Sequence, residues 1–317
     1  MTQIDSLSQC EKNDERINTP TSLDNNISTS NSKSCLIPIR IITHNIRYAT
    51  TSPFKGEEPW SVRCPLVCSQ LVFNSVLPET FISLQEVLHS QLMDINDALN
   101  DPTVLGGPWS HIGVGRDDGK EAGEYSPIFY RPDVWQLLTW ETVWLSETPD
   151  IPSKGWDAGC IRLVTCGVFQ HRHTKQKVVV LNTHLDNSGA ISRQHSAKII
   201  LGIVDEMLKV QSPVTLLLTG DFNSPPDDQA YQIMTASDSS MQDTGVTVPK
   251  EKRHGNEMTF TSFGYVDNTP SRIDFIFSAK ETNVRLGAHA VLSNRFDDGI
   301  YLSDHRAVVL DLEVFSQ

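Results

Sequence analysis

The stretch Leu216-Leu217-Leu218-Thr219-Gly220-Asp221-Phe222-Asn223 is the part of this sequence that most directly indicates its fold. Three consecutive leucines form a short apolar run, which is typical of a strand buried on both faces. The run ends at once in Gly, Asp and Asn, residues that favour turns. Such a strand delivers polar side chains to the edge of a sheet, where loops carry function. We therefore predict a buried strand with Asp221 and Asn223 at its end.

Five other short polar segments adjoin apolar runs in the same way. They are Thr43-His44-Asn45, Gln85-Glu86, Asn182-Thr183-His184, Arg272-Ile273-Asp274 and Ser303-Asp304-His305. Any one of them could be a plain turn or a helix cap. Together they supply carboxylates, amides and imidazoles at strand ends, which indicates one hydrolytic site that uses a hard metal ion. We expect these side chains at a solvent-facing rim, outside the core.

Three of these residues offer oxygen ligands to a metal. Glu86 is an ionised carboxylate, which suits Mg²⁺ or Mn²⁺ better than zinc. Asn45 adds a neutral oxygen that can help to hold the metal or a phosphate, and Asp304 can join from the far end of the chain. Such an ion polarises a phosphoryl oxygen and neutralises developing charge. Asn45, Glu86 and Asp304 are therefore the predicted metal ligands.

The remaining residues of these segments can handle protons and charge. Asp274 can orient His305, which makes a carboxylate–imidazole pair able to move a proton. Asp221 and Asn223 bracket a tight turn, where they can orient an attacking water. His184 can donate to a non-bridging phosphate oxygen. These five residues are the predicted catalytic set.

Charge and composition narrow the class of protein. The chain has 317 residues, 38% of them hydrophobic, with 26 basic and 39 acidic side chains and a formal net charge of −13. This balance argues against broad, nonspecific binding of nucleic acid, which needs clustered Lys and Arg. It does not exclude a nuclease, because an empty metal site is itself acidic. No apolar run is long enough to span a bilayer, so we expect no membrane partner.

The chain divides into a tail and one domain. Residues 1–35 are rich in Ser, Thr, Asn and Asp, so we predict a disordered tail before a catalytic domain over residues 36–317. Helices are predicted over residues 61–76, 89–100 and 192–210, and strands over 110–114 and 125–130, with the loop 115–124 between these two strands. No repeat or internal linker appears.

The cysteines indicate a reducing compartment. Cys10, Cys35, Cys64, Cys68, Cys160 and Cys166 include no CxxC pair and no spacing typical of zinc. In a long chain without a secretion signal, we interpret them as reduced thiols. We therefore expect a cytoplasmic or nuclear protein. We also expect it to be a monomer.

The six segments, in this order, resemble the endonuclease/exonuclease/phosphatase superfamily, which includes deoxyribonuclease I, apurinic endonucleases, deadenylases and inositol polyphosphate phosphatases. The resemblance covers about residues 36–315. It implies a four-layer α/β/β/α sandwich, with two packed mixed sheets flanked by helices, and metal-dependent phosphoester hydrolysis with Mg²⁺ or Mn²⁺. It gives Asn45, Glu86, His184, Asp221, Asn223, Asp274, Asp304 and His305 the same roles that the residue types indicate.

Three further stretches are similar to a microbial subgroup of that superfamily with little assigned function. They are residues 113–120 with 123–130, residues 144–149, and Lys154-Gly155-Trp156-Asp157-Ala158. Their polar and aromatic side chains would line a groove beside the metal, so Tyr125, Trp156 and Arg162 are assigned to substrate binding with Asn45. The alternative is that Trp144 and Trp156 only pack this insertion against the sandwich.

Arg47 departs from one branch of the resemblance. Apurinic endonucleases carry an acidic residue two positions after the first-strand Asn, whereas this chain has Arg47, which could form an ion pair or contact a second phosphate. We assign Arg47 to substrate binding as well. Three functions stay open: a nuclease-like phosphodiesterase, such as a 3′-to-5′ exoribonuclease acting on short single-stranded nucleic acid; a phosphatase or phosphodiesterase on a small soluble phosphoester, such as a sugar, nucleotide or inositol phosphate; and an inactive binding module.

Overall fold

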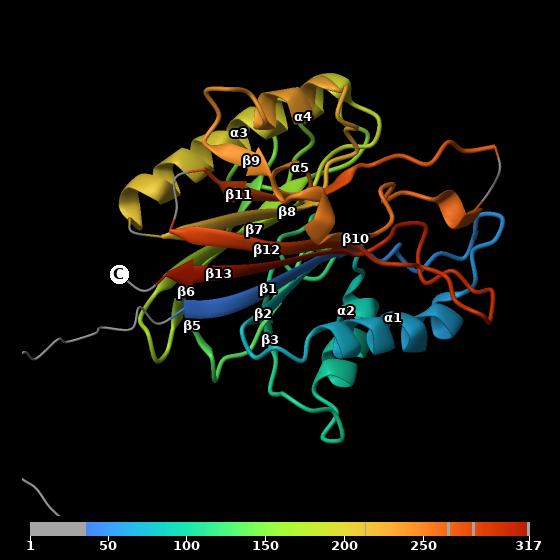
Figure 1. The fold of residues 1–317 in the computed structure, drawn as a ribbon. Helices are drawn as coiled ribbons and strands as arrows, with labels where there is room; N and C mark the ends of the chain where they lie inside the picture. The colour runs from blue at the N-terminus through green and yellow to red at the C-terminus, as the bar shows by residue number, and fades with distance from the viewer. Residues whose placement is uncertain (1–35, 213, 265–266, 281–282, 316–317) are drawn as a thin grey trace, which may run out of the picture. The chain divides into compact units, whose positions relative to one another are not determined.

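The computed structural model describes residues 36–212, 214–264, 267–280 and 283–315. The predicted tail, residues 1–35, lies outside the described residues. The described part is built on two mixed β-sheets with helices on their outer faces, which confirms the predicted sandwich (Figure 1). The first sheet has the strand order β10-β12-β13-β1-β2-β4-β3. Its strands are β1 (Leu36–Asn45), β2 (Thr80–Gln85), β3 (Ser110–Ile112), β4 (Ile128–Tyr130), β10 (Arg253–Gly255), β12 (Val284–Val291) and β13 (Val308–Phe315).

The second sheet has the order β5-β6-β7-β8-β11-β9. Its strands are β5 (Trp135–Trp144), β6 (Leu163–His171), β7 (Lys177–His184), β8 (Thr215–Asp221), β9 (Met241–Asp243) and β11 (Asp274–Ala279). The α-helices are α1 (Trp60–Asn74), α2 (His89–Leu99), α3 (Ala190–Val210), α4 (Gln229–Met234) and α5 (Thr244–Thr247), with 3₁₀ turns at Lys250–Lys252 and Ser262–Gly264. The predicted helices and strands are thus present, with ends that agree or differ by up to three residues.

The three leucines of β8 show how the layers are held together. Leu217 packs between the two sheets with Ile41 of β1, whereas Leu216 and Leu218 face the opposite side and pack against α3 and α4. All three are fully buried, as the apolar run predicted. Each such side chain stabilises the fold by about 1.5–3 kcal/mol. On the other outer face, α1 and α2 cover the first sheet (Figure 1).

Strand direction brings the polar segments to one end of the sandwich. β1 and β2 are parallel, with Asn45 opposite Gln85, so Glu86 follows beside Asn45. β7 and β8 are also parallel, with His184 opposite Asp221. β11 runs antiparallel to β8 and begins opposite Asp221. The carboxyl ends of β1, β2, β7 and β8 and the start of β11 therefore meet at the same end of the sandwich.

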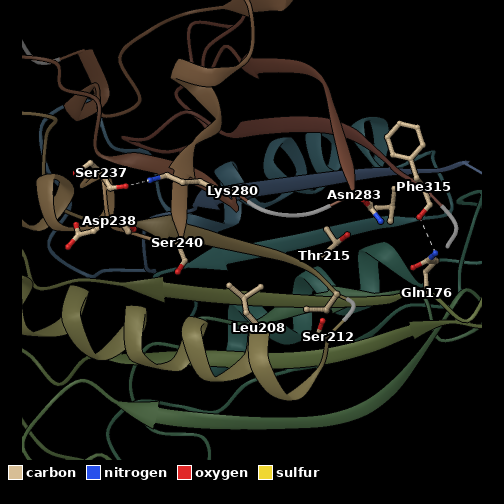
Figure 2. Close-up of a pocket in the computed structure, with 13 residues that line it drawn as sticks. Gln176, Leu208, Ser212, Thr215, Ser237, Asp238, Ser240, Lys280, Asn283 and Phe315 are labelled. Atoms are coloured by element: carbon tan, nitrogen blue, oxygen red, sulfur yellow. Dashed lines mark hydrogen bonds between the residues drawn. The ribbon is translucent and has the colours of Figure 1, made fainter.

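A pocket of about 660 Å³ lies at the other end of the strands (Figure 2). It is lined by the start of β8 at Thr215, the end of β13 at Phe315, and Lys280, whose Nζ donates to the carbonyl oxygens of Ala236 and Ser237. None of the predicted site residues lines it, so it is a feature separate from the candidate active site.

The expectations of reduced thiols and of no membrane-spanning segment can be compared with the described residues. Cys64, Cys68, Cys160 and Cys166 form no disulfide, in agreement with the predicted thiols. Within the described ranges, no helix has both the length and the apolar character needed to cross a bilayer.

Candidate active site

Asn45 links the two sheets at the centre of the site. Its Nδ2 donates to Glu86 Oε1 at 3.0 Å in the first sheet and to Asp221 Oδ2 at 2.9 Å in the second. Its Oδ1 accepts from the Arg47 backbone N–H at 3.0 Å. The amide thus fixes two carboxylates relative to each other.

The backbone around these residues is held in an unusual conformation. Arg47, Glu86 and Asn223 have φ values of 59°, 58° and 45°, in the left-handed region that side chains other than Gly rarely adopt. Gly220 approaches so closely that an added Cβ would lie 2.1 Å from the Thr183 carbonyl oxygen. Such strain gathers where a site fixes its side chains, and here it aims Glu86 and Asn223 into the site.

His305 forms a proton-handling pair with Asp274, as the sequence predicted. Nδ1 of His305 lies 2.8 Å from Asp274 Oδ2, and its Nε2 faces Asp221 Oδ2 at 3.6 Å. Burial opposes a charged imidazole, but the carboxylates of Asp274 and Asp221 raise the pKa of His305 well above its ordinary value. Burial, then the charge of Asp274, raises the pKa of Asp221 to about 7. Asp221 can therefore exchange a proton near neutral pH.

His184 is held by Asn223. Asn223 Nδ2 donates to the Leu185 carbonyl oxygen and to His184 Nε2, both at 3.0 Å, so this network places the imidazole proton on Nδ1. Burial, with the nearby charges of Arg162 and Arg116, lowers the pKa of His184 well below its usual value. A neutral His184 is thus an uncharged hydrogen-bond donor on its Nδ1 side.

The site is crowded with negative charge. Glu86, Asp221, Asp274 and Asp304 gather near His305, and burial, with Glu86 as the nearby like charge, raises the pKa of Asp304. Arg47 lies near Glu86, with Nη1 3.6 Å from Oε2, but its Nε is bonded to Glu57. Bound cations resolve such crowding, and oxygen donors are what Mg²⁺ and Mn²⁺ prefer. The donor set fits a hard divalent cation.

Ligand-type atoms of Asp221, Asp274 and His305 also lie within 4.8 Å of one another. A cation could in principle sit among these three instead of at Glu86. An imidazolium has no free lone pair, and His305 Nδ1 is already bonded to Asp274. The chemistry therefore favours Glu86 and Asp304 as metal ligands and the His305 trio as a proton-transfer group.

The sequence profile of the Endonuclease/Exonuclease/phosphatase family matches residues 43–305. The chain belongs to this family.

Several solved structures resemble the chain. An endonuclease/exonuclease/phosphatase from Bacteroides vulgatus is 32% identical over 88% of this chain and 99% of the other, with a TM-score of 0.74. The mannosyl-6-phosphatase Bt3783 of Bacteroides thetaiotaomicron is 31% identical over 86% and 99%, with a TM-score of 0.72. The human Nocturnin catalytic domain, 14% identical over 89% and 97%, shares the fold with a TM-score of 0.64. No curated protein matches the chain.

Family membership settles the class of the protein. Enzymes of this family are metal-dependent hydrolases of phosphoesters, and so is this chain. The site described above lies within the matched residues, with Asn45 near their start and His305 at their end. The predicted family, fold and enzyme class are therefore confirmed.

The structure brings the predicted metal-binding and catalytic residues together, but not on an open rim. Asn45, Asp221, Asp274 and His305 are all less than 5% exposed, and Asp304 is 7% exposed. The expectation of a solvent-facing rim was wrong in this respect. Glu86 and Asn223 stay partly exposed, so the site meets solvent there while its other ionisable groups are buried.

The predicted substrate-binding residues differ in their surroundings. Arg47 takes the first of its two suggested roles, since it pairs with Glu57 and packs on the rings of Tyr48 and Phe54. Trp156 stacks on His195 of α3 with ring centroids 4.2 Å apart, a packing contact of the kind that the alternative reading described.

Tyr125 and Arg162 lie closer to the catalytic centre than Trp156 does. Both line a narrow pocket beside His184. The Tyr125 hydroxyl donates to the Lys120 carbonyl oxygen at 2.9 Å, so this side chain also fastens the loop 115–124. These positions keep both residues as candidates for substrate binding.

Arg116 and Glu124 belong to the stretches predicted to line a groove beside the metal, but neither was given a role of its own, and Asp186 was not considered. Arg116 and Glu124 form an ion pair of 2.7 Å next to His184, and Asp186 lies 3.3 Å from Arg162 Nε. The Gly-rich segment around Arg116 marked that region as unusual. Nothing in the local sequence pairs Arg116 with Glu124, because the loop conformation brings them together.

Proposed function

We propose that this protein is a divalent-metal-dependent phosphatase that releases phosphate from a small, soluble phosphomonoester. The observation that carries this proposal is the partly buried Arg116–Glu124 pair at one side of the catalytic centre, with Glu124 Oε2 3.8 Å from His184 Nδ1. A nucleic acid that is cut at an internal phosphate must continue on both sides of that phosphate. A small phosphoester has no such requirement and fits a site walled on one side.

The similarity to the mannosyl-6-phosphatase supports the same proposal, because it extends over nearly the whole of that chain. The competing prediction, a 3′-to-5′ exoribonuclease, has weaker support. Zebrafish TDP2, whose structure holds a single-strand DNA product, is only 17% identical and shares the fold alone. The net charge of −13 also disfavours a long nucleic acid substrate.

The residues would share the work as follows. Glu86 and Asp304 would hold Mg²⁺ or Mn²⁺, which polarises a phosphoryl oxygen when bound. Asn45 orients Glu86 and Asp221 through its amide. Asp221, with its pKa near 7, would accept a proton from the attacking water.

The two histidines would contact the phosphoryl group from different sides. His184 would donate from a neutral ring to a phosphate oxygen. The His305 imidazolium, held by Asp274, would stabilise charge that develops on the phosphoryl group. Asn223 positions His184, and its own backbone N–H donates to Asp221 Oδ1 at 2.8 Å. A monomeric state and a cytoplasmic or nuclear location stay predictions.

A panel of substrates, each assayed in millimolar Mg²⁺, tests the proposal. Phosphate release would be measured on sugar phosphates, nucleotides and inositol phosphates, and strand cleavage on short RNA and single-stranded DNA. The proposal expects phosphate release from at least one small phosphomonoester and much slower cleavage of both polymers. Efficient shortening of RNA, without release of phosphate from the small esters, would establish the exoribonuclease prediction instead.

A further inference from the structure

The pocket beside His184 has features that the proposed chemistry at phosphorus does not use. Its walls come from the loop 115–124, through Arg116 and Glu124, and from Arg162, which precedes β6. Glu124 lies on the Nδ1 side of His184, with Oε2 3.8 Å from that nitrogen, whereas Nε2 of the same ring faces Asn223 and Asp221. The pocket side chains are therefore placed to contact the part of a substrate that is not the phosphate.

Arg116 and Glu124 are held rigidly at the base of their loop. Arg116 Nη1 donates to Glu124 Oε2 at 2.7 Å, and the Arg116 backbone N–H donates to the Glu124 carbonyl oxygen at 3.1 Å. Trp144 Nε1 donates to the Arg116 carbonyl oxygen at 2.9 Å, which ties the loop to the end of β5. The pair is therefore preorganised.

Arg162 is fixed from the other side of the pocket. Its Nε lies 3.3 Å from Asp186 Oδ2, and its Nη2 donates to Asn187 Oδ1 at 3.1 Å. Burial would raise the pKa of Asp186, but backbone N–H groups of Gly159, Gly189 and Cys160 lower it to about 2. Asp186 is thus a permanent anion that holds this guanidinium in one orientation.

Two buried nitrogens of the pocket's guanidinium groups, Arg116 Nε and Arg162 Nη1, are left without a hydrogen-bond partner among the described residues. His184 Nδ1 is likewise unpartnered, and it is the donor assigned above to a phosphate oxygen. The Arg162 side chain is only 5% exposed, and the two other side chains are also largely buried. An unsatisfied buried donor costs about 1–3 kcal/mol. The space beside the two guanidinium groups is about 10 Å³, which admits one water-sized polar group such as a single hydroxyl that accepts from them.

The charge balance of the pocket distinguishes between classes of ligand. Arg116 is neutralised by Glu124, and Arg162 by Asp186. A second phosphate would bring further negative charge against the Glu124 carboxylate, which already pairs with Arg116. A hydroxyl group can accept from a guanidinium and donate to a carboxylate at the same time. One hydroxyl of a sugar matches this mixture of donors and acceptor.

We infer that Arg116, Glu124 and Arg162 form a hydroxyl-binding subsite that selects phosphorylated sugars or polyols among small phosphomonoesters. This inference rests on the proposed phosphatase function and names its substrate class. The residues are specificity residues, since they contact the sugar and not the reacting phosphorus.

The test compares two substrates that differ only in the part the subsite would contact. Phosphate release in Mg²⁺ would be measured on mannose 6-phosphate and on n-hexyl phosphate, which carries no hydroxyl. A site built to bond hydroxyls rejects an analogue without them, so kcat/KM should favour the sugar phosphate by at least about 100-fold. Glu124→Gln and Arg116→Lys should each reduce that preference about 10- to 100-fold, with most of the loss on the sugar phosphate.

Matched controls are available on the neighbouring strands. Arg172→Lys changes an exposed arginine at the opposite end of β6 from Arg162, and Glu141→Gln changes an exposed glutamate of β5. Both should keep the full preference. Thermal melts check that each variant is folded, and Arg116→Lys makes the same test if Glu124→Gln does not fold.

The outcomes separate the inference from the function on which it rests. Release of phosphate from both substrates without preference would overturn the subsite and leave the phosphatase proposal standing. Equal losses on both substrates in the variants would also overturn it. A sugar bisphosphate is assayed alongside them, and a strong preference for it that the variants lose would overturn the inference and assign the pocket to a second phosphate. No release from either substrate would overturn the subsite, and no release from any ester of the wider panel would contradict the proposed function as well.

Discussion

At the scale of single residues, function depends on pairs of side chains that act as units. His305 and Asp274 are joined by a 2.8 Å contact, and Asp274 Oδ1 has no hydrogen-bond partner among the described residues. In this arrangement Asp274 acts on the substrate only through the imidazole that it orients. The same logic applies to Asn223 and His184, so the loss of either positioning residue should resemble the loss of its histidine.

Because His305 and Asp274 act as one unit, we expect the effects of their mutations on the rate to be non-additive. His305→Ala should lower the rate by about 10²- to 10⁴-fold, the usual range for a lost proton-handling group. Asp274→Asn should lower it similarly, and the double variant should be little worse than either single one, because one function is removed once. Single-turnover rates measure this, with the exposed His173→Ala as a control. If the two losses multiplied, the residues would act independently.

His289 of β12 lies outside the site, and we expect it to make the stability of the protein depend on pH. Burial, helped by the charge of Arg272, lowers the pKa of His289 to about 4, whereas an unfolded histidine has a pKa of about 6.5. Between these values the unfolded chain binds more protons, so stability falls as the pH falls through this window. At pH 5 the cost is about 2 kcal/mol.

Urea unfolding at pH 7.5 and pH 5 measures this contribution. The loss of stability between the two pH values should be smaller in His289→Gln than in the unchanged protein by about 2 kcal/mol. His44, with a pKa lowered to about 4 by burial, titrates in both proteins and so cancels. An identical loss in the two proteins would show that His289 is protonated in the folded state.

At the scale of elements, one helix takes its N-terminal cap from a distant segment. The residue before α3 is Gly189, which has no side chain to cap the helix. Asp157, from the segment before β6, accepts from the backbone N–H groups of Ser192 at 2.7 Å and Ile191 at 3.2 Å. A carboxylate there also interacts favourably with the helix dipole.

Replacing this cap should destabilise the protein. Asp157→Ala should lower the free energy of unfolding by about 0.5–2 kcal/mol, the usual effect of a lost cap. Asp150→Ala, an exposed aspartate of the same segment, is the control and should have little effect. Chemical unfolding of the two variants compares them directly. Equal stabilities would mean that water replaces the Asp157 cap without loss.

The strands and the site residues at their ends could be predicted because their signals are local. The Leu216–Leu218 run followed by Gly220 and Asp221 carries both the strand and its end. The Arg116–Glu124 pair, the Asp186–Arg162 contact and the Asp157 cap could not be predicted, because each joins residues that a loop or the whole fold brings together. The burial of the site was missed for the same reason, since segments from both sheets create it.

At the scale of the whole molecule, the described residues hold both sheets, their covering helices and the complete candidate site. We therefore expect a protein that starts at Leu36 to fold and to hydrolyse substrate as the full chain does. Melting temperature and kcat/KM of the two proteins should agree. Aggregation of the shortened protein, or a large loss of activity, would show that residues 1–35 contribute to folding or to the site.

The central claim is that the carboxylates at these strand ends hold a divalent metal for phosphoester hydrolysis. The most direct test measures the Mg²⁺ dependence of phosphate release in the unchanged protein and in Glu86→Gln. Excess EDTA should abolish activity and Mg²⁺ should restore it. Because Glu86→Gln removes an ionised oxygen ligand, its half-saturating Mg²⁺ concentration should rise by about tenfold or more. Full activity in EDTA, or an unchanged Mg²⁺ requirement in Glu86→Gln, would contradict the account.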